Sequence, residues 1–291
     1  MESLTNEQRR AVLDQYMTHM EAEDLRPDAF PFPYNAVAGV KEVKWSLQLF
    51  AESLVSGELQ EMTNALNRWK GALRRWDAWN RVLAAQDEEA RWDTELEFVE
   101  PVAFLCMFQP SAARDHFTLV ATNALHQVRL TIGNAYKDKL LGDPESPGKS
   151  GRFPPRSGRE QQLANLAQGW GAADPFLAAL KAIDSKDYRK LTADFRNRAS
   201  HGITPNFSYG YTAIVTRQVV QASRLEQQPD GTYRDTPIPG KLSVRYGYGG
   251  TPPLQLADAW TANLEQFVHA KTCFDAFVVL LTEAVGAMPV D

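Results

Sequence analysis

The sequence predicts a mainly α-helical protein: a helical bundle with an additional N-terminal helical region and a small antiparallel β insertion. Most of the chain carries apolar residues at spacings of three and four, which is typical of amphipathic helices. Residues 211–248 instead carry β-branched residues and turn signals. The chain has 291 residues, of which 44% are hydrophobic and 23% are charged. A chain of this size and composition can bury a sizeable core without disulfides or structural metals.

The N-terminal helical region is expected to span residues 1–96. Its three helices are predicted at residues 5–23, 36–56 and 58–86. Thr5 can cap the first helix, and Gln8, three residues further on, can complete a capping box. Gly57 is expected to end the second helix, because glycine commonly follows the last residue of a helix.

The long helix at residues 58–86 combines an apolar seam with a basic surface. The seam recurs at spacings of four and three: Met62, Leu66, Trp69, Leu73 and Trp76. The same segment holds five basic residues: Arg68, Lys70, Arg74, Arg75 and Arg81. We expect the seam to lie in the core, while the basic residues form either a solvated face or a surface for RNA phosphates.

The second region, residues 97–291, is expected to be a helical bundle. An acidic stretch at residues 88–100 is interpreted as the boundary between the two regions. A long helix is predicted at residues 111–136, followed by a loop rich in Pro, Gly and Ser at 141–157. The last helix is predicted at residues 253–287.

Three shorter helices are expected between that loop and the β insertion, and each begins at a capping signal. The signals are a capping box of Ser157 and Glu160, Asp174 followed by Pro175, and Ser185. The helix that begins at Ser185 is expected to run to about residue 201. Gly202 then ends it in a left-handed conformation.

The β insertion is expected to form two or three antiparallel strands within residues 211–248. Residues 229–232, Pro-Asp-Gly-Thr, have the chemistry of a tight turn. Residues 241–246 alternate polar with apolar side chains, which is typical of a strand.

Charge and cysteine usage narrow the classes of function. The chain has 31 basic and 36 acidic residues, which argues against wholesale nucleic-acid binding but allows a local basic site. Cys106 and Cys273 lie among apolar neighbours, so two buried thiols and a reducing compartment are expected.

The N-terminus lacks the apolar stretch of a signal peptide, and residues 274–285 are too short to span a bilayer. These features predict a cytoplasmic protein with no membrane partner.

No metal or other cofactor is expected from the sequence. The histidines outside the segment discussed next show no metal-ligand spacing, and the sequence has no Cys-x-x-Cys or His-Glu-x-x-His pattern. Gly-x-Ser-x-Gly is also absent, so a serine hydrolase lacks support.

One segment carries the candidate chemistry: Phe195-Arg196-Asn197-Arg198-Ala199-Ser200-His201-Gly202. RNA can be cut by attack of its own 2′-OH on the adjacent phosphate, which needs a base, an acid and positive charge on the phosphate. Histidine titrates near neutrality and can act as base or acid. Arginine binds phosphate oxygens through two hydrogen bonds and stabilises the charge that develops. Arg196 and His201 are the residue types that this chemistry needs.

The surroundings of this segment are basic. Residues 185–202 contain five basic and two acidic residues, which predicts a local site for anions on an acidic protein. Arg189, Lys190 and Arg198 are candidates for RNA binding. Ordinary surface arginines and a histidine at a helix end are the alternative interpretation.

The string Phe-Arg-Asn-x-x-Ser-His-Gly at a helix end resembles the HEPN family (higher eukaryote and prokaryote nucleotide-binding domains). These proteins are helical bundles with Arg-Asn-x-x-x-His near the end of a late helix. The resemblance covers about residues 98–202 and 253–287, with the strands as an insertion. It implies a metal-independent endoribonuclease whose active residues are Arg196, Asn197 and His201.

The resemblance also implies partners. Many HEPN proteins form homodimers in which two motifs meet, and many belong to phage-defence or toxin–antitoxin systems, so an antitoxin or defence partner is expected. The chemistry favours a dimer too, because one His201 cannot be base and acid in the same step. Toxins of one branch carry Tyr two residues after the His, whereas this chain has Ile203. The alternative function is a non-catalytic HEPN-like module that binds a nucleotide or a partner protein.

Overall fold

The computed structural model of the chain describes residues 4–27, 31–47, 49–133 and 135–289. The chain divides into two compact units: a helical unit, Met1–Thr192 with Leu256–Asp291, and a hairpin unit, Ala193–Gln255. The described residues are mainly helical with an antiparallel hairpin, which confirms the predicted mainly α class with a small β element. Within these residues, no helix has both the length and the apolar character that crossing a membrane requires.

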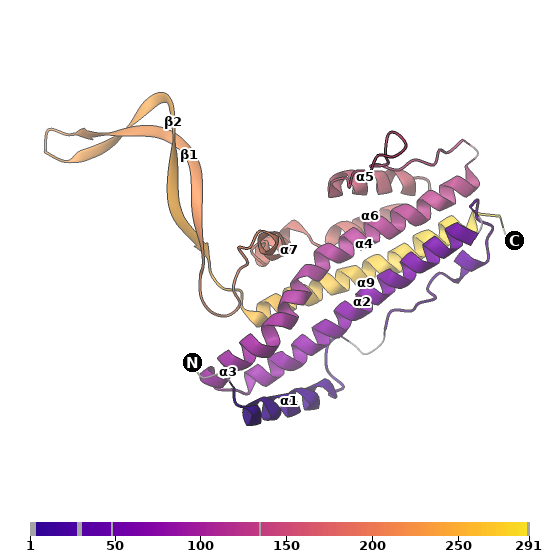
Figure 1. Cartoon of the computed structure of the whole chain (residues 1–291), viewed down its shortest axis with the longest axis horizontal. Coiled ribbons are helices and arrows are strands. Elements are labelled where there is room, and N and C mark those ends of the chain that lie inside the picture. The colour runs from indigo at the N-terminus through magenta and orange to yellow at the C-terminus, as the bar shows by residue number, and fades with distance from the viewer. Residues whose placement is uncertain (1–3, 28–30, 48, 134, 290–291) are drawn as a thin grey trace. The chain divides into compact units, whose positions relative to one another are not determined.

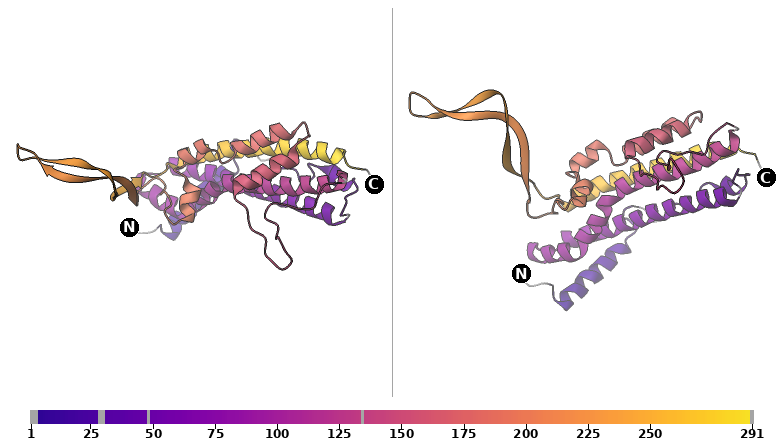
Figure 2. Two further views of the ribbon diagram at one scale, coloured as in Figure 1. Left: turned by 90° about the horizontal axis from the view of Figure 1, so that it is seen from above. Right: turned by 45° about the horizontal axis from the view of Figure 1, so that its top comes forward.

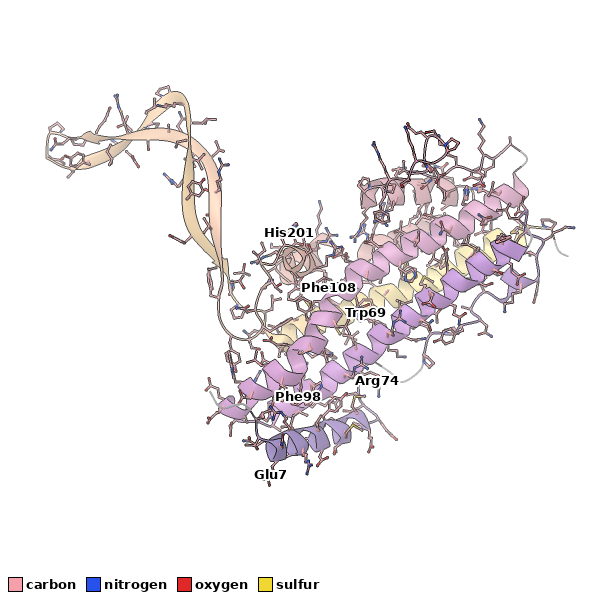
Figure 3. All side chains as sticks on the ribbon, in the orientation of Figure 1. Glu7, Trp69, Arg74, Phe98, Phe108 and His201 are labelled. Carbon is pink, nitrogen blue, oxygen red and sulfur yellow. The ribbon has the colours of Figure 1, made fainter. Side chains whose placement is uncertain are left out.

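Three long helices form the core of the helical unit and lie side by side (Figure 1). They are α2 (Leu49–Ala84), α4 (Glu100–Ile132) and α9 (Leu256–Gly286). Every residue of the expected seam of α2 is buried, which confirms that prediction. Trp69 lies inside this bundle (Figure 3), where its Nε1 donates a 2.8 Å hydrogen bond to Oδ1 of the buried Asn263.

The start of α2 differs from the expectation. Instead of a helix over residues 36–56, the chain forms a short 3-10 helix, η1 (Ala38–Lys41), and α2 then runs from Leu49 straight through Gly57. A glycine inside a helix costs about 1 kcal/mol relative to alanine. The buried seam of this 36-residue helix outweighs that cost, so the predicted stop at Gly57 is wrong.

Helix α1 (Asn6–Met20) contacts α2 and begins at the predicted capping box. The Thr5 hydroxyl accepts a 3.2 Å hydrogen bond from the Gln8 N–H, and the Gln8 side chain accepts one of 2.8 Å from the Thr5 N–H. Tyr16 of α1 stacks on Trp79 of α2 with ring centroids 4.3 Å apart.

The acidic stretch at residues 88–100 is helical. Helix α3 (Glu88–Thr94), a π-helical turn, η2 (Glu95–Val99), and α4 follow one another without a break. Asp87 begins this run, because its carboxylate accepts a 2.9 Å hydrogen bond from the Ala90 N–H. Helix α4 therefore begins well before residue 111, and the expected division between residues 96 and 97 falls inside η2.

Shorter helices contact α4 and α9: α5 (Arg156–Ala167), α6 (Ala173–Ala182) and α7 (Lys186–Leu191). The Ser185 cap is confirmed, since its hydroxyl accepts a 3.2 Å hydrogen bond from a backbone N–H of α7. The Ser157 capping box is wrong, because Glu160 pairs with Arg114 at 2.7 Å instead. Asp174 lies in the first turn of α6 rather than at its cap, so that prediction is also wrong.

The hairpin unit contains helix α8 (Phe195–Ser200) and the strands β1 (Thr212–Gln227) and β2 (Tyr233–Thr251). The strands pair antiparallel as a two-stranded sheet, with a register shift between Gln221 and Ser223. Figure 2 shows the hairpin as a long twisted ribbon, as expected for an isolated strand pair. The predicted insertion is confirmed as antiparallel, and β2 continues beyond residue 248.

Candidate active site

The predicted catalytic residues lie on and beside α8, which is separate from α7. The expected single helix from Ser185 to about residue 201 is wrong, because α7 ends at Leu191 and the chain turns before α8 begins. Ala193 and Asp194 adopt left-handed φ angles of 50° and 53°, which non-glycine residues rarely do. Arg196 therefore lies in the first turn of a new short helix.

The other end of α8 confirms the prediction for Gly202. Its φ is 71°, and its N–H donates a 3.1 Å hydrogen bond to the carbonyl oxygen of Ala199. The Ile203 N–H donates one of the same length to the carbonyl oxygen of Arg198. This pair of bonds is the Schellman arrangement, which leaves His201 as the C-cap residue of α8.

The side chains with catalytic potential face solvent. Arg196, Asn197 and His201 are all exposed, and His201 is labelled in Figure 3. Within the described ranges, the side chains of Arg196 and His201 have no hydrogen-bond or ion-pair partner in the protein. Both groups are therefore available to a ligand.

Asn197 has a positioning contact. Its Nδ2 donates a 3.0 Å hydrogen bond to Oδ2 of Asp194, the left-handed residue that precedes α8. Its carbonyl oxygen accepts a 2.7 Å hydrogen bond from the Ser200 hydroxyl. Asn197 thus links both ends of α8 and stabilises the backbone that carries Arg196.

Ideal helical spacing would place Arg196 and His201 on different sides of α8. Five residues at about 100° each rotate a side chain by about 500°, which leaves about 140° between the two. His201 is the C-cap, and its φ of −106° departs from the helical value. Helical spacing alone therefore predicts that the two groups of one chain diverge.

The three candidate RNA-binding residues differ in their surroundings. Arg198 is half-buried, and its Nη1 donates a hydrogen bond to Oγ1 of Thr251 at the end of β2. Arg189 lies on α7, in the helical unit, where its Nη2 lies 2.6 Å from Oδ2 of Asp184. Lys190, also on α7, is exposed. Arg198 and Arg189 thus have contacts that stabilise the fold as well as a positive charge.

Charge is segregated between the two units. The hairpin unit contains seven basic and four acidic residues, which gives a net charge of +3. The whole chain carries −5, so the helical unit carries −8. The unit that carries the motif is therefore the one that attracts anions.

Two of the five basic residues of α2 hold the N-terminal segment in place. Arg74, labelled in Figure 3, donates hydrogen bonds of 2.8 Å from Nη1 to the carbonyl oxygens of Leu25 and Pro27. Arg81 pairs with Asp24 at 2.8 Å. These contacts favour a structural role over the RNA-phosphate surface considered for this helix.

The helical unit contains a cavity that is separate from the motif. It has a volume of about 510 Å³ and lies between residues 33–42 and the helices α2 and α9. Asn35, Lys41 and Gln60 contribute polar groups to its wall. Its volume is within the range of small-molecule sites.

Neither a set of metal ligands nor a similarity to known proteins indicates the function of the site. In the part of the chain that the structure describes, no three His, Cys, Asp or Glu side chains could together hold a metal ion. No family model matches the chain, and no curated protein and no solved structure is significantly similar to it. The likeness to the HEPN family therefore rests on the motif at Arg196–His201.

Sequence reasoning missed an aromatic and basic surface on the hairpin. Tyr246 and Tyr248 are exposed on β2, and Arg217 of β1 pairs in register with Tyr246. The signal was present in the sequence, because the alternation noted at residues 241–246 continues to Tyr248. It was interpreted only as evidence for a strand.

Proposed function

We propose that this protein is a metal-independent endoribonuclease of the HEPN type that cleaves RNA by attack of the 2′-OH. The observation that carries the proposal is the pair Arg196 and His201, both exposed and without partners in the described protein, on the unit with net positive charge. A solvated arginine and histidine at the two ends of one short helix are suited to a polyanionic substrate.

The roles follow from the chemistry of each group. Neutral His201 takes the proton of the 2′-OH, the 2′ oxygen forms a bond to phosphorus, and the bond from phosphorus to the 5′ oxygen breaks. The 5′ oxygen takes a proton from the protonated His201 of a second copy of the chain. Arg196 stabilises the extra negative charge on the phosphate. The products are a 2′,3′-cyclic phosphate and a 5′-OH.

The protein acts as a homodimer in this proposal. One chain supplies one His201, whereas the step needs a base and an acid together. The divergence that helical spacing predicts for Arg196 and His201 favours the same arrangement, since a second chain can present its groups to the same phosphate. Light scattering at micromolar concentration should give about twice 32.6 kDa. A monomer at all concentrations that support cleavage would contradict the composite site.

The deciding experiment uses one RNA oligonucleotide and a matched oligonucleotide with a single 2′-deoxy residue at the mapped cleavage position. We expect the RNA to be cut in excess EDTA and to leave a cyclic phosphate, and the deoxy-substituted RNA to resist cleavage at that position. Cleavage at the deoxy position, or products with a 3′-OH, would rule out the proposed nucleophile.

The cavity at residues 33–42 favours a second candidate, a module that binds a small ligand such as a nucleotide. In that case, nucleotide binding is measurable by calorimetry and RNA is not cut.

The endoribonuclease proposal includes a role in phage defence or in a toxin–antitoxin pair. Coexpression with the neighbouring genes of its host should then relieve the growth inhibition that the endoribonuclease alone causes.

A further inference from the structure

The hairpin presents one face on which apolar, aromatic and basic side chains lie together. Antiparallel partners point to the same side of the strand pair, and so do residues two apart. The register pairs Val215 with Tyr248, Arg217 with Tyr246 and Val219 with Val244. These six residues, here called the tyrosine face, therefore share one side of the ribbon.

The tyrosine face is open to solvent. Tyr248 is 98% exposed and Tyr246 66%, and the three valines of the face are exposed as well. A two-stranded hairpin is only marginally stable in water without further contacts. A contiguous apolar and aromatic surface of this kind is typical of a binding site.

The charges of the hairpin indicate an anionic partner. Each acidic side chain of the strands and turn accepts a hydrogen bond within the hairpin: Glu226 from Arg224 and Thr236, Asp230 from Thr232, and Asp235 from Ser223. In contrast, four basic side chains have no hydrogen-bond or ion-pair partner among the described residues: Arg217, Arg234, Lys241 and Arg245. The unpaired charges are positive. Because like charges repel, contact between the hairpins of two copies of the chain is disfavoured.

We propose that the tyrosine face binds single-stranded RNA. Tyr246 and Tyr248 lie two residues apart on one strand, about 7 Å, so each ring can stack on a separate base. Arg217, directly across from Tyr246, can then contact the phosphate between those bases. Stacking needs unpaired bases, so a duplex does not fit this surface.

The same unit connects this surface to the motif. Arg198 of α8 donates a hydrogen bond to Thr251, whose register partner is Thr212 at the start of β1. The ring of Phe195 lies against that of Phe207, with centroids 5.3 Å apart. RNA on the hairpin is thereby held by the unit that carries Arg196 and His201. That this RNA is also the substrate rests on the proposed function, whereas binding does not.

The test measures binding by fluorescence anisotropy with a 5′-labelled 12-nucleotide RNA of mixed sequence, in the full-length His201→Ala background to prevent cleavage. Tyr246→Leu with Tyr248→Leu keeps apolar bulk and removes the rings, and it should raise Kd at least about tenfold. Phenylalanine at both positions should restore binding, because stacking needs the ring and not the hydroxyl. Tyr233→Leu, at the exposed tip, is the matched control and should change Kd less than twofold.

Salt dependence provides a second readout. Arg217→Ala should lower the slope of log Kd against log salt concentration by about 0.7, the value for one lost phosphate contact on a single strand. Unchanged Kd in the double leucine variant would overturn the inference. The inference would also be overturned if a duplex bound as tightly as the single strand and the leucine pair weakened both complexes equally. A third contrary result would be a lower mass of the double leucine variant in light scattering with unchanged RNA binding, because the tyrosine face would then be an interface between copies of the chain.

The two proposals fail separately. If the His201→Ala background binds RNA through the tyrosine face but the wild type cuts no RNA, the binding surface stands and the endoribonuclease proposal fails. If the wild type cuts RNA and the leucine pair alters neither Kd nor cleavage, the endoribonuclease proposal stands and the binding surface fails.

Discussion

Arg198 of α8 donates a hydrogen bond from Nη1 to the hydroxyl of Thr251, the last residue of β2. The two residues are 53 positions apart, and their contact joins the motif helix to the base of the hairpin. Arg198 was expected to be an RNA-binding residue of the motif. The contact gives this half-buried residue a second role, because it fixes where the hairpin begins relative to Arg196 and His201 within their unit.

Loss of this contact should loosen the hairpin unit without unfolding the helical unit. Thr251→Val removes the acceptor and keeps the shape of the side chain, so we expect faster amide hydrogen exchange at residues 212–214 and 249–251. Exchange in α2, α4 and α9 should be unchanged. Thr261→Val is a matched control, because its hydroxyl only donates to a backbone carbonyl oxygen of its own helix. Equal protection of the hairpin base in both variants would show that the Arg198 contact does not hold it.

The two thiols should be inert in the native protein. Burial raises the pKa of Cys106 to about 12 and raises that of Cys273 as well. At pH 8 roughly one Cys106 in ten thousand is then a thiolate, the form that reacts. We expect no modification by iodoacetamide in the folded protein and modification of both after denaturation, measured by mass spectrometry. Rapid labelling of either thiol in the native state would contradict the observed burial.

Acid should destabilise the helical unit through Asp115. Burial by itself would raise the pKa of this carboxyl, but Arg156 and Arg159, each within 2.9 Å of it, outweigh burial and hold the pKa below its ordinary value. The stabilisation is fully present above the unfolded pKa of about 3.9 and is lost as the pH falls through the lower folded value. The free energy of unfolding in urea should therefore decrease below about pH 4.

The Asp115→Asn variant tests that assignment. It removes the charge that Arg156 and Arg159 contact, so the variant should lose about 1–2 kcal/mol of stability at pH 7. It should also show a weaker decrease of stability below pH 4. Asp258→Asn, in the first turn of α9, is the control for loss of a carboxylate on an exposed residue. A decrease equally steep in wild type and in Asp115→Asn would mean that other carboxyls carry it.

The success and failure of the sequence predictions have physical causes. The seam of α2 could be predicted because apolar residues three and four apart lie on one face of a helix, and that face is buried together with Trp69. Gly57 was misread because glycine ends a helix only where the chain adopts a left-handed conformation, which depends on tertiary contacts. The break before α8 was missed for the converse reason, since Ala193 carries no signal for the left-handed angle that it adopts and Asp194 carries only a weak one.

Local sequence predicted the cap beside the candidate site, but it did not predict the geometry of the site. The spacing of Arg196 and His201 and the cap at Gly202 follow from local sequence, and the structure has that cap. The contact between Asn197 and Asp194 depends on a helix that begins at Phe195, and the tyrosine face depends on strand register. Both are set by pairing that a single sequence does not show.

The decisive prediction concerns His201 and Arg196. His201→Ala should lower RNA cleavage by about 10²–10⁴-fold, the usual effect of losing a general acid or base. Arg196→Ala should be comparably severe, because the charge on the phosphate loses its partner, whereas Asn197→Ala should be milder and should act through the Asp194 contact. His201 and Arg196 are exposed, so the melting temperatures of their variants should stay within about 2 °C of the wild type. His269→Ala on α9 is the matched control and should cut RNA at the wild-type rate. Equal cleavage by wild type and His201→Ala in EDTA would show that the activity lies at another site. No cleavage by either protein would move the function to ligand binding.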